Sequence, residues 1–238
     1  QPKVPADLGY YDLRVPEVRE QQAELARKAG ITGFLYWHYW FGNGKRLMER
    51  VFQEVLETGK PDFPFALAWA NHSWKKKDWE GGRLHDIMLM EQTYPGEEDA
   101  RLHFEFLLKA FKDERYIKVD GCPFLYIFEP DEVPSTYLRW FRQWAQEAGF
   151  KDLYLVANVW GKNTLEHYQT MGYQAVVENN MLDLLQTKYS QMPKYKEFLY
   201  RAYRRCYQAL SGKSRGAMNY REFASKVITD ECKNRYVI

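Results

Sequence analysis

Residues 16–39 read PEVREQQAELARKAGITGFLYWHY, and this stretch decides the fold. Its first part, Pro16 to Ala29, predicts a helix, because proline suits the first helical turn, apolar residues recur at helical spacing, and Gly30 provides a stop. Its second part, Ile31 to Tyr39, is β-branched, aromatic and almost continuously apolar, which is typical of a strand covered on both faces of a parallel sheet. We therefore expect a helix that leads directly into a parallel strand.

The same alternation of helix and strand continues along the chain. Further strands are expected at 65–70, 124–128, 153–159 and 175–178, and helices at 45–58, 97–111, 135–148 and 163–171. A long helical stretch broken near 212–216 follows, and residues 236–238 resemble the beginning of a sixth strand. Residues 71–88 are interpreted as a long loop of the kind that often carries function, followed by a short extended run at 87–90. Strict alternation predicts an α/β domain with a parallel sheet.

Two architectures fit six strand candidates preceded by a helix. The first is a (β/α)8 TIM-type barrel that is incomplete in this chain. A closed barrel requires eight strands, so this interpretation places the opening strand and at least one closing strand outside the chain. An open doubly wound sheet is the alternative, but Gly42-Asn43-Gly44 lacks the third glycine of a dinucleotide fingerprint. We favour the barrel and expect residues 1–238 to form a single domain that is truncated at both ends.

Composition narrows the classes of partner. The 34 basic and 32 acidic residues are spread along the chain, which gives no global field for nucleic acid. Three cysteines match neither a disulfide framework nor a metal motif, so a reducing, cytoplasmic location is expected. No apolar stretch reaches the length of a transmembrane helix, and the histidines show no zinc-site spacing. We expect no metal and no cofactor. The aromatic fraction of 17% suits stacking against sugar rings as well as ordinary packing.

Polar and aromatic residues follow the strand candidates at their carboxyl ends, where parallel α/β folds place their sites. The ends read YWHYWF at 36–41, WANHSW at 69–74, FEPDE at 128–132, NVW at 158–160 and ENN at 178–180. Buried together, such groups require a ligand or mutual hydrogen bonds. The candidate catalytic carboxylates are Glu91, Glu129 and Glu178, and the candidate substrate contacts are His38, Trp40, Trp69, Asn71, His72, Trp74, Gln92, Tyr94 and Asn158.

Each of these residues has a structural alternative when it is taken alone. The histidines could be core or rim residues, the glutamates could be paired with arginines, and the tryptophans could be packing. Glu91 fits a solvated loop acid as well as an acid/base group. Five strand ends together favour a site, and two carboxylates beside a glycosidic bond are the chemistry that best suits an aromatic groove.

Five segments resemble the WbsX-type proteins of bacterial polysaccharide gene clusters, which are related to glycoside hydrolase family 99. They are QPKVPADLGYYDLR at 1–14, GFLYWHYWFGNGKRLMER at 33–50, GKPDFPFALAWAN at 59–71, EQTYPGEED at 91–99 and DERYIKVDGCPFLYIFEPDEVP at 113–134. The resemblance covers essentially the whole chain. It implies a barrel that acts on glycosidic bonds and requires no metal or nucleotide motif.

The chain departs from the pattern of that family in two ways. The family usually begins with a strand and continues to an Asn-Glu-Trp-x-Glu-Gly segment that holds its glutamate pair, and neither is found in residues 1–238. The pair therefore cannot be carried onto residues of this chain. An expected Trp-Ala-Asn-Glu-Asn-Trp motif also reads WANHSW at 69–74, so His72 stands in place of an acid.

These observations lead to one main hypothesis and two alternatives. The main hypothesis is an enzyme domain that cleaves or transfers glycosyl units of an oligosaccharide or polysaccharide, in the synthesis or processing of bacterial lipopolysaccharide O-antigen or capsule. The first alternative is a non-catalytic glycan-binding barrel or an inactive fragment. A nucleotide-sugar enzyme on an open sheet is the second, and it is less favoured because no phosphate cradle is visible.

Overall fold

The structure is a computed structural model that describes residues 4–5, 8–80, 83–159, 165–178 and 193–211. The chain divides into two compact units. The first comprises residues 1–158 and 163–177, and the second comprises residues 159–162 and 178–238. The first unit contains the main sheet. The described part of the second unit includes the helix α7 (Lys194–Ser211).

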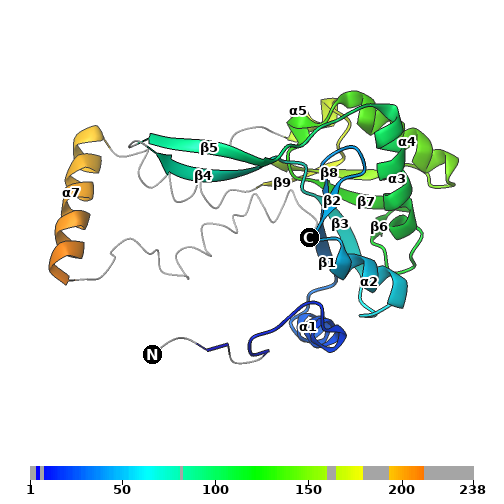
Figure 1. Cartoon of the computed structure of the whole chain (residues 1–238), viewed down its shortest axis with the longest axis horizontal. Coiled ribbons are helices and arrows are strands. Elements are labelled where there is room, and N and C mark those ends of the chain that lie inside the picture. The colour runs from blue at the N-terminus through cyan, green and yellow to red at the C-terminus, as the bar shows by residue number, and fades with distance from the viewer. Residues whose placement is uncertain (1–3, 6–7, 81–82, 160–164, 179–192, 212–238) are drawn as a thin grey trace. The chain divides into compact units, whose positions relative to one another are not determined.

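A parallel sheet forms the centre of the first unit (Figure 1). Its strands lie in the order β1-β3-β7-β8-β9, which is also their order along the chain. Parallel pairing is established by the register of Phe34 with Phe65, of Leu67 with Leu125, and of Leu125 with Leu155. The strands are β1 (Phe34–Trp40), β3 (Phe65–Trp69), β7 (Cys122–Ile127), β8 (Tyr154–Val159) and β9 (Ala175–Glu178). This confirms the expected α/β class.

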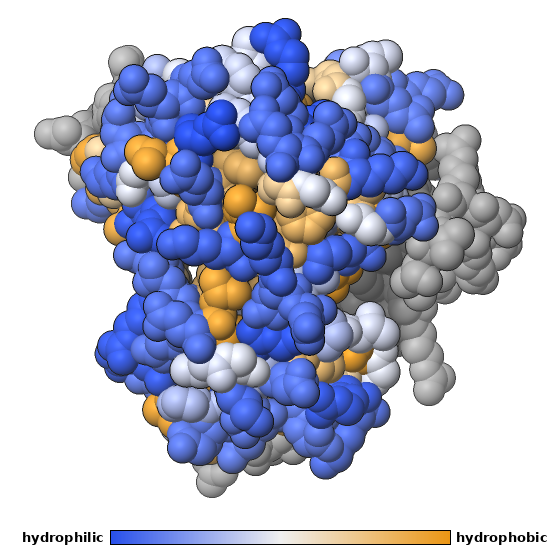
Figure 2. All heavy atoms as spheres, turned by 90° about the vertical axis from the view of Figure 1, so that its right-hand side faces the viewer, coloured by the Kyte–Doolittle hydropathy of each residue, from blue (hydrophilic) through white to orange (hydrophobic). Residues whose placement is uncertain are grey.

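One helix precedes the first strand of the sheet, and the other helices follow in the connections between its strands. They are α1 (Pro16–Lys28), α2 (Arg50–Thr58), α3 (Glu97–Phe111), α4 (Ser135–Glu147) and α5 (Leu165–Thr170), with a short 3-10 turn η1 (Pro130–Glu132). Figure 1 shows α2, α3 and α4 beside the sheet. The side of the molecule on which they lie is mainly hydrophilic, with small apolar areas between polar ones (Figure 2). Such a surface is expected where amphipathic helices cover one face of a sheet.

Side chains alternate between two faces of the sheet, as strand geometry requires. We call the face that packs on the helices the outer face. On β1 it carries His38 and Trp40, which are buried, and the His38 ring stacks on Phe106 of α3 with centroids 4.8 Å apart. We call the opposite face the inner face. It carries Leu35 and Trp37, which are 45% and 50% exposed.

The core lies between the sheet and the helices. Leu67 and Trp69 of β3, Leu107 of α3, and Ile127 of β7 have no solvent exposure. Each buried side chain of this size contributes about 1.5–3 kcal/mol relative to an exposed one. Burial of these side chains therefore stabilises the packing of the helices on the outer face of the sheet.

Arg115 links the helix side of the sheet to two loops. Its guanidinium donates to the carbonyl oxygens of Val55 and Pro61, at 3.0 Å each, and pairs with Asp113 at 2.7 Å. The hydrogen bonds from Arg115 lower the pKa of the Asp113 carboxyl. The guanidinium also lies over the Phe65 ring, 5.2 Å from its centroid. One side chain thus connects α2, the loop before β3 and the segment before β7.

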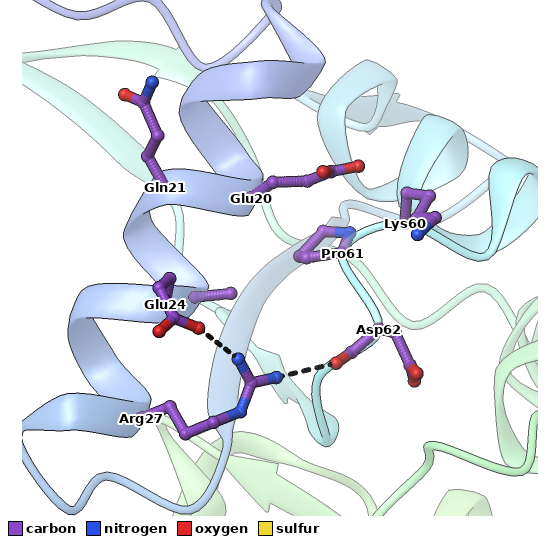
Figure 3. Close-up of a pocket in the computed structure, with 8 residues that line it drawn as sticks. Glu20, Gln21, Glu24, Arg27, Lys60, Pro61 and Asp62 are labelled. Atoms are coloured by element: carbon purple, nitrogen blue, oxygen red, sulfur yellow. Dashed lines mark hydrogen bonds and ion pairs between the residues drawn. The ribbon is translucent and has the colours of Figure 1, made fainter.

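The helix α1 is tied to the loop before β3 by an arginine (Figure 3). Arg27 donates to Glu24 at 2.7 Å and to the carbonyl oxygen of Asp62 at 3.1 Å. Its guanidinium also lies over the Phe63 ring, at 5.4 Å from the centroid. A polar hollow of about 380 Å³ separates the helix from this loop, and Figure 3 shows Lys60 among its lining residues.

Two local structures differ from the expectations. Residues 74–90, expected to be mostly loop, contain an antiparallel hairpin of β4 (Trp74–Glu80) and β5 (Arg83–Met90), with Glu80 opposite Arg83. The Gly-Gly pair at 81–82 matches the two-residue hairpin signal that predicts such a turn. The helix expected at 45–58 begins only at Arg50, because Arg46–Leu47 forms β2 and pairs with the end of β1. A short strand, β6 (Lys118–Val119), also pairs antiparallel with β7.

Candidate functional site at the carboxyl ends of the strands

Asn71 links the carboxyl ends of β3 and β7. Its side-chain Nδ2 donates to the carbonyl oxygen of Glu129 at 2.7 Å, and its Oδ1 accepts the backbone N–H of Glu129 at 2.8 Å. Nδ2 also donates to the hydroxyl of Tyr94 at 3.0 Å. Asn71 is 1% exposed, so its amide is buried and has partners on both sides. This predicted site residue therefore positions Glu129 and Tyr94.

Glu129 is the candidate carboxylate that follows the carboxyl end of β7, and its pKa differs from that of an exposed glutamate. Its side chain is partly buried, and burial raises the pKa of the carboxyl, with further increases from the nearby charges of Glu132 and Asp131. A raised pKa means that this acid keeps its proton to a higher pH than an exposed glutamate. Such an acid is suited to donating a proton.

Three polar atoms at the same strand ends have no hydrogen-bond partner among the described residues. They are Nδ1 of His72, Oδ1 of Asn158 and Oε1 of Gln92. Nδ2 of Asn158 donates to the carbonyl oxygen of Phe128 at 3.1 Å, which connects β8 to the end of β7. Buried polar atoms without a protein partner usually bind water or a ligand. These atoms could therefore bind the hydroxyl groups of a polar ligand.

His72 lies against an aromatic ring. The centroid of its imidazole is 5.0 Å from that of Phe128, and partial burial lowers the pKa of the imidazole. The ring is thus neutral over more of the pH range than an exposed histidine. A neutral imidazole can accept a proton or a hydrogen bond.

The inner face adds aromatic rings beside these polar groups. Trp37 makes edge contacts with Phe128, at 5.5 Å between centroids, and with Tyr126, at 6.2 Å. Half of the Trp37 surface is exposed, which leaves part of its ring available for contact. Burial raises the pKa of Tyr126 to about 12, so its hydroxyl remains protonated. Aromatic rings of this kind can contact the apolar faces of sugars.

Three of the predicted substrate contacts lie on the outer face instead. His38, Trp40 and Trp69 are buried between the sheet and the helices, with exposures of 5%, 5% and 0%. The indole of Trp69 donates to the carbonyl oxygen of Trp40 at 3.3 Å. Strand alternation is the reason, because even positions of β1 and odd positions of β3 point to the helices. The structure assigns these rings to packing in place of the expected sugar contacts.

The buried outer cluster contains a histidine pair. Nε2 of His38 lies 2.8 Å from Nε2 of His103, and the His103 ring stacks on Trp40 at 4.7 Å between centroids. Burial lowers the pKa of His38 to about 3 and lowers that of His103 well below its ordinary value. The indole of Trp40 donates to the Asp99 carboxylate at 3.1 Å, and Asp99 also accepts the backbone N–H of Gly44. These contacts fix α3 to the end of β1.

The remaining predicted residues occupy varied positions. Trp74 is partly buried, with its ring edge-on to Tyr39 at 5.2 Å. Gln92 is partly buried, and its backbone N–H donates to the hydroxyl of Ser73 at 2.9 Å. Glu91 is exposed. Glu178 ends β9, and its side chain is outside the described part of the chain.

Neither a metal centre nor a membrane-spanning helix is found among the described residues. No group of three or more His, Cys, Asp or Glu side chains in this part of the chain is arranged to hold a metal ion. In the same residues, no helix combines the length and apolar character needed to cross a membrane.

Sequence reasoning missed Trp37 and Phe128 as candidate contacts. Trp37 lies between two residues of β1 that face the helices, so a simple period of two along the strand could have identified it. Phe128 could have been found in the same way, by extending the alternation of β7 one residue beyond its end at Ile127.

Together, the fold and the site define an α/β protein with polar and aromatic residues gathered at the carboxyl ends of a parallel sheet, where such folds place their ligands. The model of one family, "Glycosyltransferase WbsX", matches residues 1–238. The chain belongs to this family.

Individual relatives agree with this family. The chain is 34% identical over 181 residues to the "Uncharacterized protein WxcX" of Xanthomonas campestris pv. campestris, in strain B100 and in strain ATCC 33913. That alignment covers 75% of this chain but only 25% of the relative, so the chain spans about a quarter of its length.

Solved structures provide a comparison of the fold. A "Glycoside hydrolase-like protein" superposes with a TM-score of 0.51 at 18% identity, covering 90% of this chain and 65% of that one. The GH99 endo-alpha-mannosidase from Bacteroides thetaiotaomicron gives a TM-score of 0.43 at 13% identity, covering 73% of this chain and 46% of that one. The first comparison is a likeness of fold and is compatible with a barrel-type arrangement.

Proposed function

We propose that the chain is part of a (β/α)8-type barrel domain, extending over residues 1–238, that binds a glycan on the inner face of its sheet and cleaves or transfers a glycosyl unit there. The observation that carries this proposal is the half-exposed Trp37, whose ring contacts Phe128. Phe128 also contacts the His72 ring and directly precedes Glu129 in the sequence. An aromatic ring beside a carboxyl and an imidazole fits an apolar sugar face and its hydroxyl groups.

In this proposal, Glu129 serves as a proton donor to the leaving glycosidic oxygen. Its raised pKa favours the protonated form that a general acid requires. His72 has a lowered pKa and accepts a hydrogen bond or a proton from a sugar hydroxyl. The unpartnered oxygen of Asn158 accepts from a second hydroxyl. Asn71 and Tyr94 act by positioning, because their hydrogen bonds run to each other and to the backbone of Glu129.

The other predicted residues have smaller parts in the proposed site. Trp74 and Gln92 contribute to its rim, next to the hairpin. Glu91, an exposed residue, serves as a polar contact for an extended glycan, and Glu178 stays a candidate second carboxylate. We place the activity in the cytoplasmic synthesis or processing of a bacterial surface polysaccharide, without a cofactor.

Glycan binding is tested first. Manno-oligosaccharides should quench or shift the tryptophan fluorescence of the chain. Trp37→Ala should weaken binding about 5- to 30-fold, since stacking on a ring contributes about 1–2 kcal/mol. Trp140→Ala is the matched control. Trp140 lies on α4 and stacks on Trp144 at 6.2 Å, so its removal should leave affinity unchanged. Equal losses in both variants would overturn the inner-face assignment.

Catalysis is tested separately from binding. Product analysis after incubation with manno-oligosaccharides should detect cleavage or transfer in the chain and a loss of at least about 100-fold in Glu129→Gln, which is the usual range for removal of an acid/base group. The amide keeps the size of the carboxyl, so binding should persist. Unchanged turnover in Glu129→Gln would exclude Glu129 as the acid.

A second candidate function is glycan binding without catalysis. The observation in its favour is the composition of the site. His72 lies where the family resemblance suggests an acid, and Glu91 is exposed. Binding that depends on Trp37, combined with no detectable product, would support this alternative over the enzyme.

A further inference from the structure

The helix α7 of the second unit carries an exposed apolar stripe. Tyr195, Phe198, Leu199 and Leu210 are 63%, 71%, 61% and 89% exposed. At about 100° per residue, these positions and the exposed Ala202, Cys206 and Ala209 fall within an arc of about 120° on one side of the helix. With 18 residues, the helix is about 27 Å long. It therefore presents a continuous apolar surface.

Positive charge is concentrated on the same helix. Residues 194–211 contain five Lys or Arg and one acidic residue, and residues 178–238 contain twelve basic and six acidic residues, although the net charge of the whole chain is only +2. Exposed cations flank the apolar stripe on both sides, with Lys194 and Arg205 on one side and Lys196 on the other. Cations at such positions can extend past an apolar surface toward anionic groups.

We propose that α7 lies on the surface of an anionic lipid bilayer, with its apolar stripe in the interface and its flanking cations at lipid phosphates. This combination of a Phe/Leu/Tyr stripe with Lys/Arg flanks is the pattern of helices that lie in a membrane surface. The proposal goes beyond the proposed catalytic function and does not depend on it.

Charge and apolar character together select this partner. A second copy of the helix would bring two strongly positive segments together, which costs free energy. A nucleic acid would satisfy the cations, but it offers no large apolar surface to cover Phe198, Leu199 and Leu210. An anionic bilayer complements both features of α7. Each cation near such a surface contributes about fivefold in affinity.

The experiment is cosedimentation of the whole chain with lipid vesicles. The chain should sediment with vesicles that contain phosphatidylglycerol and remain in solution with pure phosphatidylcholine vesicles. Salt at about 0.5 M should weaken the interaction by screening. The variant Phe198→Glu/Leu199→Glu should reduce the bound fraction at least tenfold, because it places two carboxylates in the apolar stripe.

Two further variants separate the proposal from a folding defect. Lys194→Gln/Lys196→Gln changes only exposed side chains and should weaken partitioning by roughly 25-fold, from about fivefold for each cation. Leu25→Glu, on α1 of the first unit, is the matched control, because Leu25 is 42% exposed and its variant should bind vesicles normally. Circular dichroism should be the same for all variants.

Three results would overturn the proposal. The first is an absence of cosedimentation with anionic vesicles in 0.1 M salt. The second is a dimer in sedimentation equilibrium that the Phe198→Glu/Leu199→Glu variant abolishes. The third is binding to single-stranded RNA that competes with vesicles and is unaffected by that variant.

Discussion

The buried pair of His38 and His103 should make the stability of the protein depend on pH. The perturbation is a shift from pH 7.5 to pH 5.0. The pKa of His38 is about 3 in the folded protein and 6.5 in an ordinary environment, so its contribution to stability is fully present above pH 6.5. As the pH falls from 6.5 toward 3, the unfolded chain binds a proton that the folded protein excludes. The free energy of unfolding should therefore decrease in that window.

The magnitude follows from the width of that window. Each pH unit corresponds to about 1.4 kcal/mol for one excluded proton, so His38 alone should remove about 2 kcal/mol between pH 6.5 and pH 5.0. His103 is buried with a pKa lowered in the same direction, and it can add up to about the same amount. We expect a total loss of about 2–4 kcal/mol, which is a large part of the stability of an ordinary domain.

The assay is urea unfolding at both pH values, followed by tryptophan fluorescence. The variant His38→Leu/His103→Leu removes both hydrogen-bond partners together, which should change stability little at pH 7.5. Its loss of stability at pH 5.0 should be smaller than that of the unmodified chain by about 2–4 kcal/mol. If the variant and the unmodified chain lost the same free energy on acidification, the histidine pair would not be the source of the pH dependence.

Three more substitutions, two of them with a matched control, test polar contacts and backbone packing in the first unit, each by urea unfolding at pH 7.5. Asn71→Leu should cost about 2–4 kcal/mol, because it leaves the Glu129 N–H and the Tyr94 hydroxyl, both partly buried, without their partner. Asn158→Leu, which removes one hydrogen bond, should cost about 1 kcal/mol. Arg115→Lys should cost about 2–3 kcal/mol, since an ammonium cannot reach Asp113 and both carbonyl oxygens at once, and a loss below about 0.5 kcal/mol would contradict that role. Gly42→Ala should cost more than about 2 kcal/mol, because the φ of Gly42 is +93° and a Cβ would lie 2.3 Å from Oγ1 of Thr93. Gly44 has open space around it, so Gly44→Ala should cost only about 1 kcal/mol of backbone strain.

Much of the fold could be predicted from local patterns. The helix at 97–111 and the strand at 175–178 were predicted with the bounds that the structure has, because each shows a clear period or a clear composition. The hairpin at 74–90 was not predicted. This segment is rich in lysine and other charged residues and has few of the β-branched residues that usually identify strands. Its two strands are instead stabilised by pairing with each other. The terminal strand expected at 236–238 and the helix break at 212–216 lie outside the described residues.

The candidate site was predicted less completely than the fold. The rule that sites lie at the carboxyl ends of strands brought Asn71, His72 and Glu129 to one edge of the sheet. It did not distinguish the two faces of a strand, so Trp40 and Trp69 were chosen for their indoles and Trp37 was omitted. Neighbouring residues of a strand point to opposite faces of the sheet. Which residues point to the helices is set by packing on α3 and α4, as the contacts of Trp40 with His103 and of Trp69 with Phe141 show.

The amide of Asn71 has a consequence for how variants of Glu129 can be interpreted. The Asn71 side chain, which follows β3, forms hydrogen bonds with both the N–H and the carbonyl oxygen of Glu129. These bonds do not depend on the functional group of the Glu129 side chain. Exchanging the carboxyl for an amide therefore alters acidity while the main chain keeps its anchor. A kinetic effect of that exchange would report on proton transfer, free from any rearrangement of the loop that follows β7.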